Sequence, residues 1–255
     1  MQSHFYRILH NRKSLFIFIL IILIPFIDVA QLLQMKIQYD VEYHPAFAFF
    51  LGGMTQGHAM QIMLIWFLPL FLLLLVSDDG IQDIETGYRQ ILISKVGRKN
   101  YLKEKMLTSF IIGFLSLFVS LLINFITVNI LFYGGTYNNG LSDIQIPDNT
   151  LYQFSMAYPY LADILFTVIA CFMAGVAGML SATVSFFFRS RKFAYASAFF
   201  IWFLLVLRQD SLVFVFQPFT EYGFETIVPV LSISLLVCIG ISFILYFIEV
   251  KYNEN

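Results

Sequence analysis

Long apolar segments, separated by short polar stretches, recur along the whole sequence and constrain its fold more than any other feature. Each is close to the ~20 residues that an α-helix needs to cross the ~30 Å hydrocarbon core of a bilayer. The segments are continuously apolar, whereas the strands of a membrane β-barrel alternate apolar and polar residues. Six spans are predicted, over residues 15–33, 61–76, 106–133, 161–188, 193–207 and 227–248. We therefore expect an all-α polytopic membrane protein.

Composition and segment lengths agree with one membrane domain over residues 1–255. Only 12% of the residues are charged, about half the ~25% of a soluble domain. The connecting segments are too short to bury a core of their own. The first apolar run is too long for a signal peptide, so we expect it to remain as an anchor. Cys171 and Cys238 lie inside apolar runs, which favours buried thiols over a disulfide.

Lys and Arg residues are distributed unevenly between the connecting segments. If the N-terminus is cytoplasmic, 13 of the 15 fall on the cytoplasmic side, and only Lys36 and Arg208 fall outside. Cytoplasmic loops of membrane proteins carry such an excess of positive residues. The sequence therefore predicts that both termini are cytoplasmic and that segments 134–160 and 208–226 are extracellular.

A charged island over residues 77–105 separates the second and third predicted spans and holds 11 of the 31 charged residues. Apolar residues recur in its first half with the spacing of one helical face. They are Ile81, Ile84, Tyr88, Ile91 and Leu92. The pattern predicts an amphipathic helix over residues 79–94 within a cytoplasmic loop, 78–105. We expect this helix to dock a soluble partner.

The other polar segments give further expectations. Residues 1–14 predict an interfacial helix on the inner leaflet, with a flexible basic tail as the alternative. Residues 134–160 contain no Lys or Arg and many turn-forming residues, which predicts a loop. Residues 210–226 are read either as a re-entrant or interfacial hairpin or as an ordinary outer loop. In the first reading, aromatic anchors lie at headgroup level: Phe214, Phe216, Phe219 and Tyr222.

Few polar residues fall within the predicted spans. Polar and charged side chains there are candidates for a translocation path, and Asp28, Asn124 and Asn129 are the residues of this kind. In the alternative interpretation, the two asparagines hydrogen-bond between helices. Asp28 and Asp163 then lie at the outer interface, where they help to fix the ends of their spans.

Small residues recur every four positions along the fourth predicted span. They are Ala170, Ala174, Gly178 and Ala182. Such a stripe allows another helix to approach closely. The pattern predicts a helix-packing face, whose partner lies either in this chain or in another.

The motifs of catalytic and nucleotide-binding sites are missing from the sequence. No His lies in an H-E-x-x-H arrangement, and there is no phosphate-binding loop and no C-x-x-C. We therefore expect no catalytic residue, metal or cofactor in this chain. We also expect the chain to contact membrane lipid and to bind no nucleic acid.

The island resembles part of a known family. Residues 85–88 read E-T-G-Y, and residues 98–105, which read R-K-N-Y-L-K-E-K, lead directly into the third span. These motifs resemble the cytoplasmic loop of type 2 ABC transporter permeases, in which an acid-Gly-Tyr or acid-Gly-Thr helix precedes Arg and Tyr-Leu-x-x-Lys. The layout is similar along the whole chain, and the motifs cover about residues 78–105. A proline that many members carry before the arginine is absent here.

The resemblance implies the transmembrane subunit of an ATP-driven exporter in a bacterial plasma membrane. Two cytoplasmic ATPase subunits would bind ATP and Mg. A second permease chain, identical or related, would complete the path for an amphipathic or hydrophobic peptide, drug or lipid. The island would be the coupling helix, with Glu85 and Arg89 paired with each other or with the ATPase. The implied coupling residues are Ile84, Glu85, Gly87, Tyr88, Arg89, Ile91 and Arg98.

Two other classes of function remain open from the sequence. A secondary, ion-coupled carrier would work without an ATPase and would need acidic residues or broken helices near the middle of the membrane. A membrane protein that does not transport, such as an intramembrane enzyme or an assembly factor, is the third class.

Overall fold

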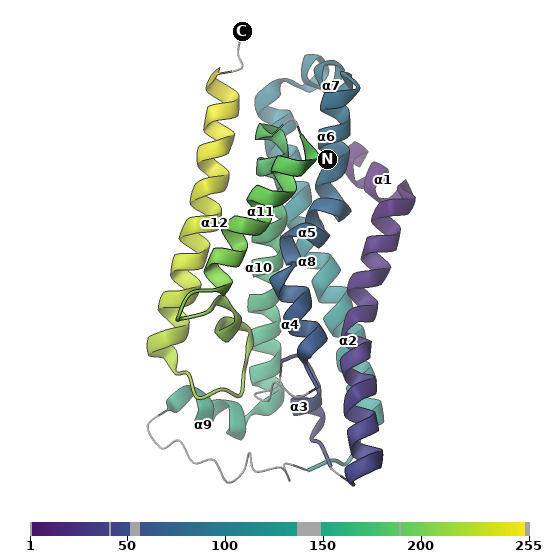
Figure 1. Ribbon diagram of the computed structural model, residues 1–255, viewed down its shortest axis with the longest axis vertical. Coiled ribbons are helices and arrows are strands. Elements are labelled where there is room, and N and C mark those ends of the chain that lie inside the picture. The colour runs from purple at the N-terminus through teal and green to yellow at the C-terminus, as the bar shows by residue number, and fades with distance from the viewer. Residues whose placement is uncertain (1, 41, 52–56, 137–148, 189, 253–255) are drawn as a thin grey trace.

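A computed structural model of the chain describes residues 2–40, 42–51, 57–136, 149–188 and 190–252. Within these residues the fold is all-helical, without strands (Figure 1). In chain order the elements are α1 (Gln2–His10), α2 (Arg12–Tyr39), α3 (Pro45–Ala48), α4 (Ala59–Trp66), α5 (Leu68–Leu72), η1 (Leu73–Ser77), α6 (Asp78–Glu85), α7 (Tyr88–Val96), α8 (Arg98–Leu131), α9 (Thr150–Ala157), α10 (Pro159–Phe187), α11 (Arg191–Val206), η2 (Leu212–Phe216) and α12 (Phe224–Tyr252).

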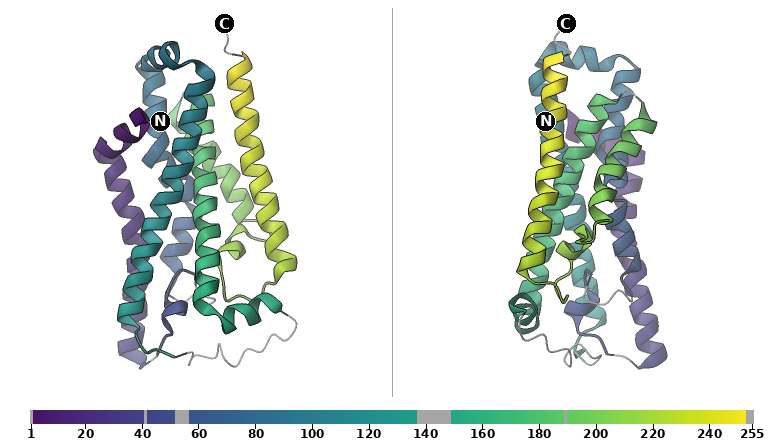
Figure 2. Two further views of the ribbon diagram at one scale, coloured as in Figure 1. Left: turned by 180° about the vertical axis from the view of Figure 1, so that it is seen from behind. Right: turned by 60° about the vertical axis from the view of Figure 1, so that its left-hand side comes forward.

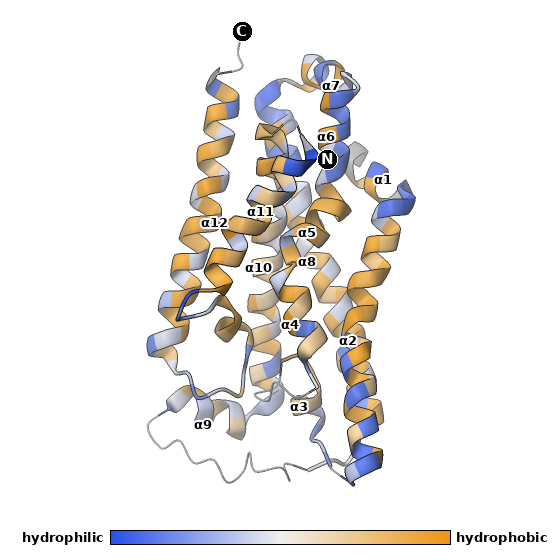
Figure 3. Ribbon diagram, in the orientation of Figure 1, coloured by the Kyte–Doolittle hydropathy of each residue, from blue (hydrophilic) through white to orange (hydrophobic). Residues whose placement is uncertain are grey.

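Among the described helices, α2, α8, α10 and α12 are four that are long and apolar enough to cross a membrane. A fifth segment qualifies if α4 and the helical run that follows it count as one span, bent by 63°. α11 is apolar but has only 16 residues. Apolar residues cover the long helices, and hydrophilic residues gather towards their ends (Figure 3). The prediction of a helical membrane protein is therefore confirmed.

The second predicted span, residues 61–76, is not one regular helix. It breaks at Phe67, one residue before the Leu68 that begins α5, and continues through a π-helical turn, η1, into α6. Pro69 has no backbone N–H, so it cannot donate a helical hydrogen bond to the carbonyl of Ile65. The indole Nε1 of Trp202 in α11 donates to this carbonyl instead, at 2.9 Å.

α2 has the same arrangement at Pro25. The Ile21 carbonyl, four residues earlier, accepts a hydrogen bond from the hydroxyl of Ser120 in α8, at 2.9 Å. Within hydrocarbon, a carbonyl freed by proline has no water to bind, and a neighbouring helix is expected to supply the donor. Both prolines are thus accommodated by side chains of another helix.

α8 and α10 pack against each other along most of their lengths, in antiparallel directions. A Cβ added at Gly113 of α8 would lie 2.7 Å from the carbonyl oxygen of Ala174 in α10. One added at Gly178 would lie 2.5 Å from the carbonyl oxygen of Ser109. The other two small residues of the stripe, Ala170 and Ala182, are also buried. Ala174 and Gly178 therefore contact a helix of the same chain.

α1, the α6–α7 hairpin and the C-terminal end of α12 lie at one end of the bundle, and α3 and α9 lie at the other (Figures 1 and 2). The helix expected within residues 1–14 is α1, which ends before Asn11, the N-cap of α2. The loop predicted over residues 134–160 is partly wrong, because α9 forms there. The side chain of Asn149 caps α9 by accepting from the Tyr152 N–H at 3.0 Å, and residues 137–148 lie outside the described ranges.

The segment after α11 folds back against α10, α11 and α12 through η2. Phe216 and Phe219 are buried in the protein, so they are not anchors at headgroup level. Phe214 stacks on Tyr222 at 3.9 Å between ring centroids. Packing against three helices distinguishes this segment from an ordinary exposed loop.

Substitution of Gly178 by Leu should disrupt the packing of α8 against α10. The new side chain would have to displace the Ser109 backbone, and overpacking of this kind costs typically 1–3 kcal/mol. We expect a lower yield of monodisperse protein in detergent and a lower Tm. Gly240→Leu in α12 is the matched control, because a Cβ there meets nothing within 4 Å. Equal yields and Tm values for the two variants would contradict this packing.

Candidate functional site

The charged island forms a helical hairpin at one end of the bundle, and its predicted single helix over residues 79–94 is wrong. α6 continues the second membrane segment to Glu85, and α7 begins at Tyr88 in a new direction. The chain turns at Gly87, with φ +73°, and again at Gly97, with φ +80°. Both values are in the left-handed region that favours glycine. The island is therefore two helices joined by a glycine turn.

α7 crosses the end of the bundle and has no buried residue (Figure 1). Tyr88 is 43% exposed and Ile91 is 52% exposed. Ile84, on α6, is half-buried. Two large apolar side chains thus remain partly exposed among charged residues, with the Arg7 guanidinium 5.6 Å from the centroid of the Tyr88 ring.

Ion pairs fix α6 to α1 and α8. The guanidinium of Arg7 in α1 donates two hydrogen bonds to the Asp83 carboxylate, each 2.8 Å long. The side-chain hydrogen bond to Asp83 raises the pKa of the Arg7 guanidinium, so this partner stays charged at any physiological pH. Lys105 of α8 is buried and pairs with Asp79.

A further pairing joins α6 to α11. Arg191 donates to Asp78 at 2.9 Å, and its guanidinium lies 3.7 Å from the Glu85 carboxylate. Asp78 also accepts from the Tyr195 hydroxyl, at 3.3 Å. Each acidic residue of α6 therefore pairs with a cation of a neighbouring element.

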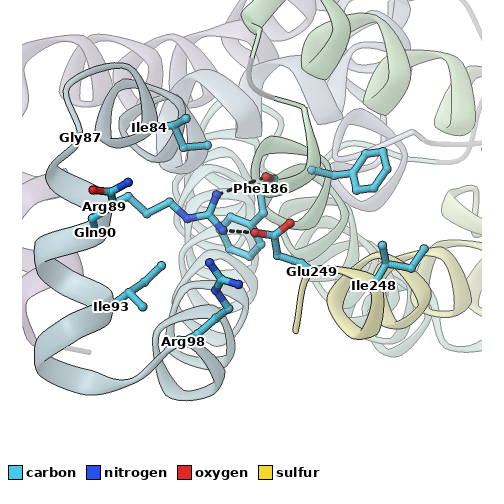
Figure 4. Close-up of a pocket in the computed structure, with 10 residues that line it drawn as sticks. Ile84, Gly87, Arg89, Gln90, Ile93, Arg98, Phe186, Ile248 and Glu249 are labelled. Carbon is cyan, nitrogen blue, oxygen red and sulfur yellow. Dashed lines mark hydrogen bonds and ion pairs between the residues drawn. The ribbon is translucent and has the colours of Figure 1, made fainter. Parts of the chain in front are cut away.

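Arg89 of α7 does not pair with Glu85, contrary to one of the expected arrangements. The turn at Gly87 directs its guanidinium inward, where it donates to Glu249 of α12 at 2.5 Å and to the Phe186 carbonyl of α10 at 3.4 Å (Figure 4). Sequence reasoning did not identify Glu249. Its only signal was an acidic residue at the end of an apolar span.

A pocket of about 530 Å³ lies beneath the hairpin, between α7, α8, α10 and α12 (Figure 4). Arg89, Arg98 and Glu249 provide its charged groups, with Ile84, Ile93 and Phe186 among its apolar walls. The Nε and Nη1 atoms of Arg98 are buried and have no hydrogen-bond partner among the described residues. Guanidinium groups with free donors bind carboxylates and phosphates well. The pocket is therefore suited to an acidic group.

The three polar residues expected to line a translocation path make different contacts in the structure. The Asp28 carboxylate accepts from the backbone N–H groups of Met60 at 3.0 Å and Gln61 at 2.8 Å, so it caps the N-terminus of α4. It is fully buried within the protein. Asn129 donates to the Phe125 carbonyl of its own helix at 2.9 Å. Asn124 is buried in α8 without a hydrogen-bond partner among the described residues.

Within the described ranges, no group of three or more His, Cys, Asp and Glu side chains could hold a metal ion.

Reversal of Glu249 to Arg should place two guanidinium groups together under α7 and destabilise that end of the bundle. Breaking a buried ion pair costs about 3–5 kcal/mol, and the Arg89 and Glu249 side chains are only 13% and 7% exposed. The double variant Arg89→Glu/Glu249→Arg should recover most of the lost Tm. Lys99→Glu, at an exposed position, is the control and should change Tm little. A double variant no more stable than Glu249→Arg alone would argue against the pairing.

The comparisons with known proteins give one whole-chain relative. The chain is 52% identical over 257 residues to the uncharacterized protein YybM of Bacillus subtilis (strain 168), with 100% of both chains covered. No family model and no solved structure matches the chain. Identity at this level, along the full length of both proteins, shows common descent and a common helical membrane fold. The chain therefore belongs to the same protein family as Bacillus subtilis YybM.

Proposed function

We propose that this protein is the transmembrane subunit of an ATP-driven ABC exporter in the plasma membrane. Two separate cytoplasmic ATPase subunits bind it, and a second permease chain completes the translocation path for an amphipathic or hydrophobic substrate. In this proposal α11 is counted with the five longer apolar segments, which gives six spans. Both termini and the α6–α7 hairpin then lie in the cytoplasm.

The observation that supports the proposal best is the uncovered apolar surface of α7. Tyr88 and Ile91 are exposed on a short helix that crosses the end of the bundle. A soluble partner with an apolar groove would bury both side chains, and aromatic residues of this kind often dominate binding energy. α7 is therefore the element that we assign to ATPase docking.

The ion pairs of the hairpin supply a route by which movement of α7 reaches the spans. Arg89 joins α7 to Glu249 of α12, and its donation to Phe186 joins it to α10. α6, directly connected to α7, is paired with α1, α8 and α11. A displacement of the hairpin by an ATPase would thus be transmitted to most of the bundle. This is the mechanical requirement for coupling ATP hydrolysis to transport.

The pocket beneath α7 supports the same assignment. Arg98 lines it with buried N–H groups that have no hydrogen-bond partner in the described parts of the chain. An acidic side chain of the ATPase, inserted next to α7, would satisfy these donors. Charge complementarity of this type mainly fixes orientation and specificity of docking.

Substitution of Tyr88 by Ala should release the ATPase without unfolding the permease. The loss of a buried aromatic anchor costs about 2 kcal/mol or more, which is a roughly 30-fold weaker affinity. We expect less ATPase in pull-downs and less transport, at a normal level of protein in the membrane. Tyr133→Ala is the matched control, because Tyr133 is 89% exposed and lies beyond the far end of α8. If Tyr88→Ala retains both the ATPase and transport, α7 is a connecting segment only.

The orientation can be tested by cysteine labelling of intact cells. Cysteine at position 138, which lies outside the described residues, should react with a membrane-impermeant maleimide. Lys99→Cys, near the hairpin, should react only after the membrane is permeabilised. The native Cys171 and Cys238 are buried and should contribute little background. Labelling of position 99 in intact cells would overturn the six-span arrangement.

An ion-coupled carrier is the second candidate function, and one observation favours it. Asp163 is buried in α10, and neither carboxylate oxygen has a hydrogen-bond partner among the described residues. Buried acidic residues of this kind carry protons in many transporters. Proteoliposomes that contain only this chain separate the two functions. Uptake driven by a proton gradient without an ATPase would favour the carrier.

A further inference from the structure

Asn124 and Asp163 lie opposite each other between α8 and α10. Gly113 of α8 contacts the Ala174 carbonyl of α10, and this contact fixes the position of α8 along the axis of α10. Asn124 follows Gly113 by 11 residues, and Asp163 precedes Ala174 by 11 residues. At 3.6 residues per turn, this spacing is close to three turns and returns to the same helical face. The two side chains therefore occupy the same level of an antiparallel interface.

Both side chains are buried and lack partners. Asn124 is 0% exposed and Asp163 is 2% exposed. The amide N and O of Asn124, and both carboxylate oxygens of Asp163, have no hydrogen bond to any part of the chain that the structure describes. Burial of polar groups without partners is costly, and burial of an unpaired charge is more so. A ligand with a positive charge and a hydrogen-bond donor would remove this cost.

A pocket next to Asp163 has room for such a ligand. Its volume is about 270 Å³, somewhat below the roughly 300–1,000 Å³ of sites for drug-sized molecules. Its walls are otherwise mostly apolar: Phe49, Phe118, Leu121, Phe125, Ile164 and Val168 are among them. Aromatic faces attract organic cations as well as apolar groups. The pocket thus combines one carboxylate with an aromatic, apolar lining.

The pocket opens on the outer surface of the bundle. Leu122, Ile164 and Val168 at its edge are exposed. They belong to α8 and α10, which are long and apolar enough to cross a membrane. A ligand would therefore reach Asp163 from the hydrocarbon region of the bilayer, or through the interface with a second chain packed on this face. Such access suits a molecule that partitions into lipid.

We propose that Asp163, at the level of the Asn124 amide in the facing helix, binds the ammonium group of a small apolar organic cation. The carboxylate pairs with the positive charge, and the phenylalanine rings of the pocket cover the apolar part. This assignment names a substrate class for the exporter, and to that extent it rests on the proposed function. The binding step itself requires neither ATP nor an ATPase subunit.

Equilibrium binding of benzylammonium to the purified full-length protein tests the proposal. Ethylbenzene is the neutral probe, since a methyl group replaces the ammonium group in the same shape. We expect saturable binding of the cation to the wild type and much weaker binding of the neutral probe. Asp163→Asn keeps the shape and removes the charge, and should raise the Kd of the cation about tenfold or more. Asp210→Asn, at an exposed position, is the matched control and should bind as the wild type does.

Three outcomes would overturn the proposal: no saturable binding of the cation, equal binding of the neutral probe, or an unchanged Kd in Asp163→Asn. The first two need only the wild type, so they decide the question even if the variant does not fold. The assay contains no ATPase, and Tyr88→Ala should bind the cation normally. Normal cation binding by a chain that never associates with an ATPase would overturn the exporter and leave this site standing.

Discussion

The close approach of α8 and α10 is the constraint on which the rest of the structure depends. It is possible because Gly113 and Gly178 have no Cβ where one would collide with a carbonyl oxygen of the facing helix. In lipid, apolar side chains gain little by leaving one apolar environment for another, so close packing and polar contacts drive helix association. α10 then presents its other faces to α5, α11 and α12, and α8 contacts α2. The bundle is organised around this pair.

Polar contacts at the hairpin end of the bundle fix the positions of helices that apolar packing alone does not determine. α6 extends the second membrane segment into a cluster of cations, in which Arg7, Lys105 and Arg191 each pair with one of its carboxylates. These partners come from three different helices, so the cluster fixes the position of α6 relative to each of them. α7 is held by fewer ion pairs: among the described residues, its Arg89 pairs with Glu249 of α12. The arrangement leaves the apolar side chains of α7 available for a partner.

The sequence predicted the helical membrane fold because a continuous apolar run of about 20 residues is a local property that needs no partner. It did not predict the breaks. At the bend near Pro69, the Ile65 carbonyl accepts a hydrogen bond from Trp202, a residue more than a hundred positions away. The division of the island at Gly87 escaped the periodicity analysis, because apolar spacing continues across a turn of two residues.

Residue type and local pattern determined which side chains are candidates: the arginines and Tyr88 of the island, the small residues of the fourth predicted span, and the buried Asn124. Only the tertiary structure decided their partners. Arg89 pairs with Glu249, 160 positions along the chain. Asn124 lies at the level of Asp163 because glycine contacts set the alignment of α8 against α10. Helical periodicity fixes the face on which a side chain lies. The residue opposite it depends on how two distant helices are aligned, and no local pattern contains that alignment.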